Sequence, residues 1–341
     1  MGRPLIKRQM IRGLAALGIL SLLQKLTAHR LRILCYHALA YHDEHLFCPS
    51  FFISPVRFRQ RLQWLQDNSF TVLPLPHALA LLRQNQLPEK AVVITFDDGL
   101  RSVYRFALPL LKEFSYPATI YISTDYVQKQ TPVFRLFIHD LFWRTSKKEI
   151  DLRGLLIPQL SQADLSQPKE KEQTKWKIIR HGEKNLSEDE RQFLTKKLQF
   201  LLDVPLHPFP NDYLALMNEQ EIKDAHAQGF TIALHTHNHF FPEDSLLATA
   251  QILENQKILQ NITGEKSTHF CYPSGVWHPS HFSSLEKTGV ESATTLIYGI
   301  NGPKTPKYLL RRVMDRHDLN DSEFDAEMKG LGVFLRWFKF Y

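Results

Sequence analysis

Residues 92–99 (Val-Val-Ile-Thr-Phe-Asp-Asp-Gly) form an apolar, β-branched run that ends abruptly in two carboxylates and a glycine. Such a run is typical of a buried strand in a parallel sheet. In parallel α/β sheets and barrels, the loops leaving the carboxyl ends of the strands meet on one face, and the chemistry gathers there. We therefore expect Asp97 and Asp98 to meet partners from other strand ends, although Asp-Asp-Gly is also a common turn sequence.

A second apolar run, residues 231–234, is followed by three imidazoles within five positions: His235, His237 and His239. His235 and His239 are four residues apart, so a helical turn after the strand would place both on one side. Two imidazoles and one carboxylate form a three-ligand set of the kind that binds zinc and leaves a position open for water. A polar loop is the alternative for the histidines alone, and the acidic pair upstream favours the metal site.

Together, Thr95-Phe96-Asp97-Asp98-Gly99 and the downstream His235-Thr236-x-x-His239 resemble the first two motifs of the polysaccharide deacetylases, the NodB-homology carbohydrate esterases. Residues 270–275 (Phe-Cys-Tyr-Pro-Ser-Gly) resemble the third motif in the form that lacks its arginine. The resemblance implies an α/β fold, a deformed (β/α)7-type barrel. It also implies hydrolysis of N-acetyl or similar acyl groups on sugars with a divalent metal. Zinc is expected, with cobalt, nickel or manganese as alternatives.

The resemblance also implies roles for individual residues. The metal ligands would be Asp98, His235 and His239, and Asp97 would be the general base that takes a proton from water. The backbone N–H of Ser274 matches the oxyanion donor of the family.

The general acid is expected near the N-terminus, before the strand that ends in Asp97. Residues 32–37 form a short strand that ends in Tyr36-His37. A Tyr-His strand at the N-terminus resembles the acid motif of a permuted branch, which includes deacetylases of bacterial exopolysaccharide synthesis. His37 is therefore the expected acid, with His317 in reserve. The alternative for His37 is a polar strand end without a catalytic role.

Four more residues are expected to support the site or contact the substrate: Thr236, Tyr272, Pro273 and Arg312. Thr236 stands beside the first metal histidine of the motif, and Tyr272-Pro273 belong to the third motif. Phe270 occupies the position of the family's arginine, so the usual partner of the base is missing. Arg311 or Arg312, at a distant strand end, is the candidate replacement.

Strands and helices alternate along most of the chain, which indicates a parallel sheet. Residues 134–211 interrupt this pattern with polar, lysine-rich, mostly helical sequence, which indicates a helical insertion over the barrel mouth. We expect a catalytic barrel over residues 31–320, a separate N-terminal helix over residues 1–30 and a C-terminal tail over residues 321–341.

The composition indicates a folded protein, with 43% apolar and 23% charged residues among 341. Three cysteines, Cys35, Cys48 and Cys271, argue against a disulfide framework, and we expect them to be small buried side chains. The formal net charge of +7 would suit an anionic partner. The sequence has no zinc-finger, RNA-recognition or helix-turn-helix signature, so nucleic acid is not expected as that partner.

Both ends of the chain resemble membrane-interface segments. Residues 13–23 are apolar and flanked by basic residues, but too short to span a bilayer, and no clear cleavage site follows. Residues 332–341 mix aromatic residues with Arg336 and Lys339. We expect peripheral membrane contact at the cytoplasmic membrane surface, with periplasmic or extracytoplasmic anchoring as the alternative. Each segment could instead pack on the domain.

The sequence thus predicts a hydrolase acting on carbon–nitrogen bonds other than peptide bonds. It would remove N-acyl groups from an amino-sugar polysaccharide or lipid-linked glycan, in cell-surface polysaccharide metabolism. One alternative is an O-acetyl esterase or a lipid-linked sugar deformylase on the same site. Another is a catalytically inactive glycan-binding or assembly protein, which the intact Asp97, Asp98, His235 and His239 argue against.

Overall fold

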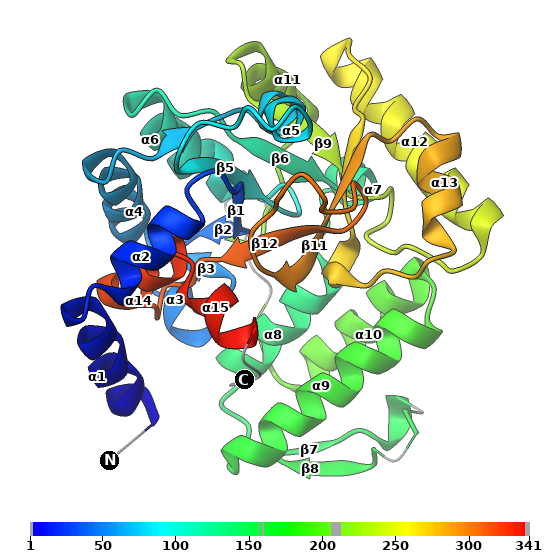
Figure 1. Ribbon diagram of the computed structural model, residues 1–341. Helices are drawn as coiled ribbons and strands as arrows, with labels where there is room; N and C mark the ends of the chain where they lie inside the picture. Colours follow the sequence, from blue (N-terminus) through cyan, green and yellow to red (C-terminus); the bar gives the residue numbers. More distant parts are fainter. Residues whose placement is uncertain (1–2, 156, 159, 206–212, 338–341) are drawn as a thin grey trace. The chain divides into compact units, whose positions relative to one another are not determined.

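The computed structural model describes residues 3–155, 157–158, 160–205 and 213–337 (Figure 1). The chain divides into two compact units. One unit comprises residues 1–128 and 217–341, and the other comprises residues 129–216.

Seven parallel strands of the first unit close into a barrel in the order β1-β12-β11-β10-β9-β6-β5, and β5 pairs back with β1 (Figure 1). These strands are β1 (Arg32–Tyr36), β5 (Ala91–Phe96), β6 (Thr119–Ile122), β9 (Thr231–Leu234), β10 (His269–Cys271), β11 (Ser292–Tyr298) and β12 (Leu310–Met314). The short β4 (Thr71–Val72) pairs with the first half of β5. The deformed (β/α)7-type barrel expected from the sequence is confirmed.

Burial explains the composition of the central strands. Every residue of β1, β5, β6 and β10 is buried. Barrel strands pack side chains inward on one face and under helices on the other, so they have no polar face. The continuous apolar run before Asp97 follows from this arrangement. Two further strands, β2 (Ala38–Leu39) and β3 (Phe52–Ile53), pair with each other beside the barrel.

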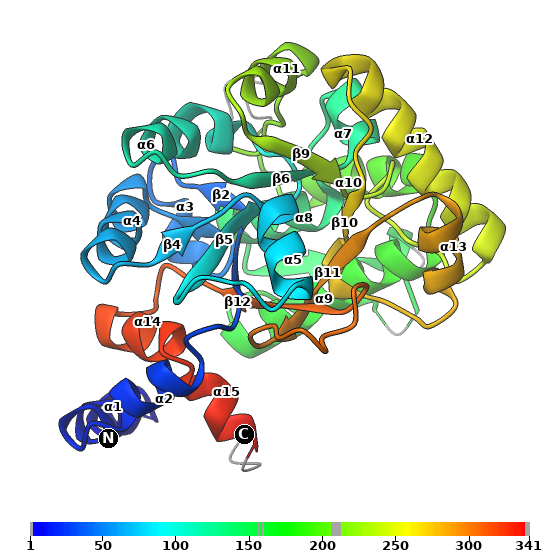
Figure 2. The same ribbon diagram turned by 45° about the horizontal axis from the view of Figure 1, so that its top comes forward.

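Helices connect the strands around the barrel (Figure 2). They are α3 (Glu44–Phe47), α4 (Pro55–Asp67), α5 (Leu75–Arg83), α6 (Leu108–Glu113), α7 (Thr124–Lys129), α11 (Glu219–Ala227), α12 (Ser245–Thr263) and α13 (His281–Lys287). Ser54 caps α4 by accepting a hydrogen bond from the backbone N–H of Arg57. Pro109 lies at the start of a helix and does not interrupt one. It occupies the first turn of α6, after a π-helical segment over Val103–Ala107.

The two ends of the chain pack against each other beside the barrel (Figures 1 and 2). The helices involved are α1 (Arg3–Ala16), α2 (Ile19–Leu26), α14 (Asp321–Met328) and α15 (Leu331–Trp337). The apolar run over residues 13–23 is not one helix, because Gly18 adopts a left-handed conformation with φ 72° and separates α1 from α2. In the described part of the chain, no helix has the length and apolarity that crossing a membrane requires.

The second unit lies between β6 and β9 in sequence and has its own apolar core. It contains α8 (Phe134–Arg144), α9 (Pro168–Asn185), α10 (Glu188–Leu201) and an antiparallel pair, β7 (Glu149–Asp151) with β8 (Gln162–Asp164). Helix α10 begins with a capping box formed by Ser187 and Glu190.

We predict that His269 makes the protein less stable in acid. Burial lowers the pKa of His269 to about 4, from an ordinary value of 6.5, and its Nδ1 lies 2.9 Å from Ser292 Oγ. As the pH falls below 6.5, the unfolded chain takes up a proton that the folded chain excludes until about pH 4. The free energy of unfolding should therefore fall by roughly 2 kcal/mol between pH 7 and pH 5 through this group.

Urea unfolding of the wild type and a His269→Gln variant at both pH values checks this prediction. The variant should lose less stability between pH 7 and pH 5 than the wild type does. His77→Gln, at an exposed position of α5, is the matched control and should keep the wild-type pH dependence. Equal pH dependence in all three proteins would show that His269 is not responsible.

Candidate functional site

The ends of five barrel strands bring reactive side chains to one place. They are His37 after β1, Asp97 and Asp98 after β5, His235 after β9, Cys271 at the end of β10 and Arg312 within β12. This is the carboxyl end of the barrel, where the sequence places the chemistry.

Asp98, His235 and His239 converge on one point. Asp98 Oδ1 lies 3.1 Å from His235 Nε2 and 3.2 Å from His239 Nε2. Three ligands at about 2.1 Å from a tetrahedral zinc ion lie about 3.4 Å from one another, so these separations suit a metal ion. Asp98 and His235 are only 3% and 1% exposed. A carboxylate and two imidazoles held together away from water therefore form a fitting cation site.

The tautomer of His235 supports this fit. Its Nδ1 lies 2.8 Å from the carbonyl oxygen of Cys271, which can only accept a hydrogen bond. Nδ1 therefore carries a proton, and Nε2, which faces Asp98, is the nitrogen that can bind a metal ion or a second proton. A lone pair and a carboxylate directed at the same point require a cation or a proton between them.

The two histidines do not meet through a helical turn, so that expectation is wrong. No helix follows β9 before α12. Instead, Thr236 and His239 adopt left-handed backbone conformations, with φ 63° and 56°. These two reversals fold a tight loop that returns His239 to the side of His235.

The adjacent residues Asp97 and Asp98 have different partners. The backbone turns sharply at Asp98 and Gly99, before the following helix begins. Asp98 has φ 70° and Gly99 has φ 76°. A side chain at Gly99 would also be too close to Ile122, since a Cβ there would lie 2.7 Å from Ile122 Cδ1. Glycine is thus required by both backbone conformation and packing.

Asp97 forms a buried, two-pronged ion pair with Arg312. Arg312 Nη1 lies 2.7 Å from Asp97 Oδ1, and Nη2 lies 2.8 Å from Oδ2. Arg312 Nε also donates to the carbonyl of Thr295 at 2.8 Å. Burial alone raises the pKa of Asp97, but the guanidinium more than offsets this and holds the pKa below its ordinary value. Of the two candidate arginines, Arg312 lies at the site and Arg311 is exposed.

Two thiols also contact Asp97. The Sγ atoms of Cys35 and Cys271 lie 3.7 and 3.6 Å from Asp97 Oδ2. Burial raises the pKa of the Cys35 thiol well above its ordinary value, so it stays protonated and can donate to the carboxylate. Sequence reasoning treated both cysteines only as small buried side chains. The sequence did contain one signal for these contacts, because Cys35 and Cys271 lie in predicted strands that end at motif residues.

Asp98 is a better metal ligand than Asp97. Among the described residues, three groups of side chains come close enough to share an ion: Cys35 with His37 and Asp97, Asp97 with His235 and Cys271, and Asp98 with His235 and His239. The first two groups use Asp97, whose charge Arg312 already neutralises. The guanidinium of Arg312 would repel a cation bound at Asp97. In the ion pairs of the described part of the chain, the ligand set that includes Asp98 has no such cationic neighbour.

His37 lies beside Asp97. Its Nε2 is 3.8 Å from Asp97 Oδ2, and its ring packs 4.6 Å from the ring of Phe51. Burial lowers the pKa of His37 below its ordinary value. Nδ1 of His37 is buried and has no hydrogen-bond partner among the described residues. The reserve candidate His317 packs instead on His45, with ring centroids 4.1 Å apart.

The third motif places one backbone N–H for possible use by a ligand. Ser274 has φ 56°, and the N–H groups of Gly275 and Val276 donate to Tyr272 and Pro273. The N–H of Ser274 donates to no group in the described part of the chain. Ser274 as a residue is half-buried.

The remaining predicted residues are buried around the site. Thr236 is fully buried, and its Oγ1 donates to the carbonyl of His235 at 2.6 Å. Tyr272 is also fully buried and packs against Phe270 and His281. Neither side chain is exposed for contact with a substrate, so both support the loops that carry the site.

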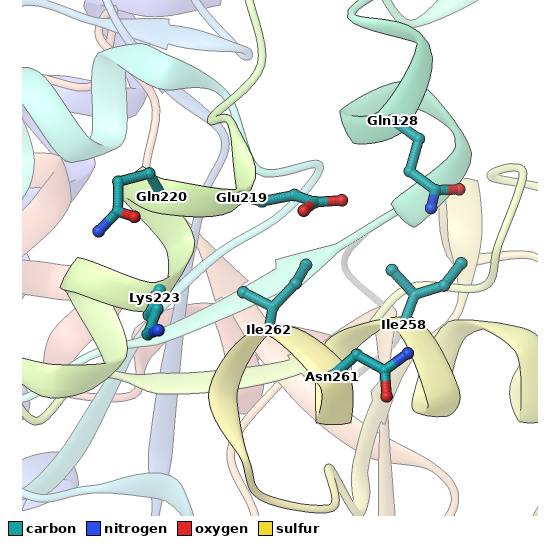
Figure 3. A pocket seen from close by; sticks show the side chains of 7 residues that line it. All are labelled: Gln128, Glu219, Gln220, Lys223, Ile258, Asn261 and Ile262. Atoms are coloured by element: carbon teal, nitrogen blue, oxygen red, sulfur yellow. The ribbon is translucent and has the colours of Figure 1, made fainter.

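A hollow of about 380 Å³ lies elsewhere in the first unit, among α7, α11 and α12 (Figure 3). Polar side chains dominate its lining: Gln128, Glu219, Gln220, Lys223, Ile258, Asn261 and Ile262. None of the predicted site residues lines it, so it is separate from the candidate metal centre.

The closed parallel barrel is of the NodB-homology deacetylase type, as comparison with solved structures shows. A deacetylase of Streptococcus pyogenes, PplD in complex with acetate, aligns with a TM-score of 0.60 and 17% identity over 89% of this chain and 99% of its own. IcaB from Ammonifex degensii aligns with a TM-score of 0.57 and 19% identity over 88% and 97%. At these identities the likeness concerns the fold.

The family follows from the sequence. The family model described as polysaccharide deacetylase matches residues 84–177 and 195–293, which is more than half of the chain. The chain belongs to the polysaccharide deacetylase family.

Curated relatives match over shorter stretches. The putative polysaccharide deacetylase YxkH of Bacillus subtilis is 35% identical over 94 residues, which are 27% of this chain and 32% of that protein. The poly-β-1,6-N-acetyl-D-glucosamine N-deacetylase of Staphylococcus aureus is 25% identical over 175 residues, 50% of this chain and 56% of its own. The chain thus spans about a third and about half of the length of these relatives.

We predict that Arg312 holds the buried charge of Asp97 in place. Arg312→Met would leave that carboxylate without a counter-charge, so the free energy of unfolding should fall by about 3–5 kcal/mol. Adding Asp97→Asn removes the unpaired charge and should recover much of the loss. Urea unfolding of the wild type, both single variants and the double variant measures the interaction.

Arg311→Met is the control for this cycle, because Arg311 is the exposed neighbour on the same strand. It should change the free energy of unfolding by no more than about 0.5 kcal/mol. A double variant no more stable than Arg312→Met alone would contradict the proposed pairing energy.

Proposed function

We propose that the protein is a metal-dependent hydrolase that removes N-acetyl groups from an amino-sugar polysaccharide. One observation carries the proposal: two adjacent aspartates have different partners, Asp98 facing two imidazoles and Asp97 facing a guanidinium. Amide hydrolysis needs both an electrophilic centre and a separate base, and this pair supplies a place for each. Membership of the polysaccharide deacetylase family supports the same reaction class.

Asp98, His235 and His239 would hold the metal. A divalent ion bound there supplies Lewis-acid polarisation of the substrate carbonyl and lowers the pKa of water. Zinc suits two imidazoles and a carboxylate, and cobalt, nickel and manganese also accept such ligands.

Asp97 is the general base in this proposal. Arg312 keeps its carboxylate ionised and fixes its orientation through two hydrogen bonds. An ionised carboxylate beside the reaction centre can accept a proton from the attacking water. The protonated thiol of Cys35 adds a further contact to one carboxylate oxygen.

His37 completes the proton transfer. Burial lowers the pKa of His37, so the resting imidazole is uncharged at neutral pH. It can receive the proton that Asp97 has taken from water and pass it to the leaving nitrogen. Because Asp97 Oδ2 and His37 Nε2 are 3.8 Å apart, which is too far for a direct hydrogen bond, this transfer would pass through a bridging water. The hydroxide adds to the acetyl carbon, the carbon–nitrogen bond breaks and the amine takes this proton.

The backbone N–H of Ser274 is the proposed donor to the oxyanion that forms on the acetyl group. It is directed by the left-handed conformation of Ser274 and makes no other hydrogen bond among the described residues. A donor that is already oriented and unused stabilises developing charge without reorganisation.

The proposed substrate is a polymer of N-acetylglucosamine. Its support is the Staphylococcus aureus relative named for poly-β-1,6-N-acetyl-D-glucosamine. A lipid-linked sugar carries the same acetamido group, so comparison of both substrates with the purified protein tests the choice.

The first test of the proposal separates the base from the metal ligands. Asp97→Asn should keep bound metal but release acetate from N-acetylglucosamine oligomers at least about 100-fold more slowly, because the base is lost. His239→Ala should lose both metal and activity. Acetate release and elemental analysis of the same preparations measure the two properties. Full activity of Asp97→Asn would reject the assigned base.

A second test addresses the acid. An amine leaves poorly without a proton, whereas an alkoxide needs less assistance. His37→Ala should therefore slow amide hydrolysis by about 100-fold or more and slow ester hydrolysis of an acetylated chromogenic substrate much less. Equal losses on both substrates would argue that His37 positions other groups. His42→Ala, at an exposed position nearby in sequence, serves as the control.

A further inference from the structure

The packed ends of the chain form a surface with unusual chemistry. The terminal helix cluster, defined here as α1, α2, α14 and α15, has its own apolar core. The buried members are Ile11, Leu20, Leu23, Ala326 and Leu331. This core buries only one side of α2, the side that carries Leu20 and Leu23.

The outer side of α2 and the preceding turn leaves large apolar side chains in solvent. Leu17 is 76% exposed, Leu22 is 57% exposed and Leu26 is 70% exposed. Leu22 and Leu26 are one helical turn apart and share a face. Three leucines so exposed within ten residues form a concentrated apolar patch rather than the scattered exposure of an ordinary surface.

The charge around this patch has a single sign. Residues 1–42 contain seven Lys and Arg residues and no Asp or Glu. Arg12 and Lys25 are exposed and form no ion pair with any described residue. Their charges are therefore available to a partner outside the chain.

The acidic residues of α14, the nearest source of opposite charge, already have partners. Asp325 pairs with Lys329 at 2.7 Å, and Asp321 pairs with Arg57 at 2.7 Å. Glu327 accepts a hydrogen bond from Tyr298. Glu323 caps the start of its own helix. The cationic side of α1 and α2 is thus not neutralised within the cluster.

We propose that the outer face of α1 and α2 docks the protein on an anionic lipid membrane. Leucines that enter the interface, flanked by cations that meet lipid phosphates, are the two requirements of an interfacial helix. The two helices are too short to span a bilayer, so they lie on it. A second copy of this chain fits poorly, because a symmetric dimer would place two basic surfaces opposite each other.

The segment after α2 and the last residue of α14 lie at the amino ends of barrel strands, away from the candidate metal centre at the carboxyl ends. Arg32, the first residue of β1, donates from Nε to the carbonyl of Met328 at 2.6 Å. The backbone N–H of Lys90, just before β5, donates to the carbonyl of Ala28 at 2.8 Å. These contacts fix the cluster to the amino ends of the strands. Docking there leaves the carboxyl ends open to a substrate.

Co-sedimentation of the full chain with vesicles tests this proposal. Vesicles of phosphatidylcholine with one third phosphatidylglycerol should bind the protein, and pure phosphatidylcholine vesicles should bind it much less. Binding should weaken as sodium chloride rises, because salt screens the cations. Arg12→Gln with Lys25→Gln should weaken binding by about 25-fold at low salt, which is about five-fold per charge. Leu22→Gln with Leu26→Gln should weaken it by roughly ten-fold or more.

Leu253→Gln with Lys257→Gln, on α12, is the matched control, because it removes an exposed leucine and a lysine elsewhere on the surface. It should bind as the wild type does. All variants should keep wild-type acetate release from soluble oligomers, so failure of docking and failure of the proposed reaction are separate results. The proposal would be overturned by an absence of vesicle binding, by equal binding to both vesicle types, or by a loss of binding in the control variant alone. So would a lipid-independent dimer, seen by sedimentation velocity, that the leucine variant disrupts.

Discussion

The two-pronged ion pair between Asp97 and Arg312 is the interaction on which the site depends. Two neighbouring carboxylates buried under a barrel mouth would repel each other, and one of them would normally take up a proton. The guanidinium on β12 neutralises Asp97 inside the barrel, and the imidazoles leave Asp98 with a different environment. Adjacent residues of the same type thereby acquire separate chemical properties. A buried charge pair of this kind is tolerated because both oxygens of Asp97 accept from Arg312, and Arg312 Nε also donates to the carbonyl of Thr295.

Much of this arrangement could be predicted from the sequence. The apolar run before Asp97 required a strand buried on both faces, and strands alternating with helices required parallel pairing. Those two constraints are enough to bring distant strand ends together. The resemblance of the motifs then selected particular residues, and Asp98, His235 and His239 do lie together. The sequence left two candidates for the partner of Asp97, Arg311 and Arg312. Successive side chains of a strand point to opposite faces, and the sequence alone does not show which face of this strand points into the barrel.

Other features depended on conformations that the sequence pattern does not reveal. Spacing of four residues suggested a helical turn between His235 and His239, but left-handed residues at 236 and 239 make the loop instead. Most residues avoid that conformation, so no propensity would predict it. The contacts of Cys35 and Cys271 with Asp97 were missed because a buried thiol usually acts as a small apolar side chain. The terminal helices pack on each other through residues more than 300 positions apart, such as Leu20 and Leu331, a pairing that local patterns cannot encode.

Barrel closure has a consequence for where this protein can be cut. The segment matched by the family model runs from residue 84 to residue 293, so β1, β12 and all of β11 after its second residue lie outside it. β1, β12 and β11 are consecutive in the barrel, so a fragment trimmed to that segment would lose two whole strands and most of a third, and the barrel would be open between β5 and β10. It would also lose His37 and the counter-charge of Asp97 in the same step. A fragment chosen by sequence similarity alone would therefore be an incomplete barrel. Its unpaired strand edges and the carboxylate of Asp97 without its counter-charge would favour aggregation.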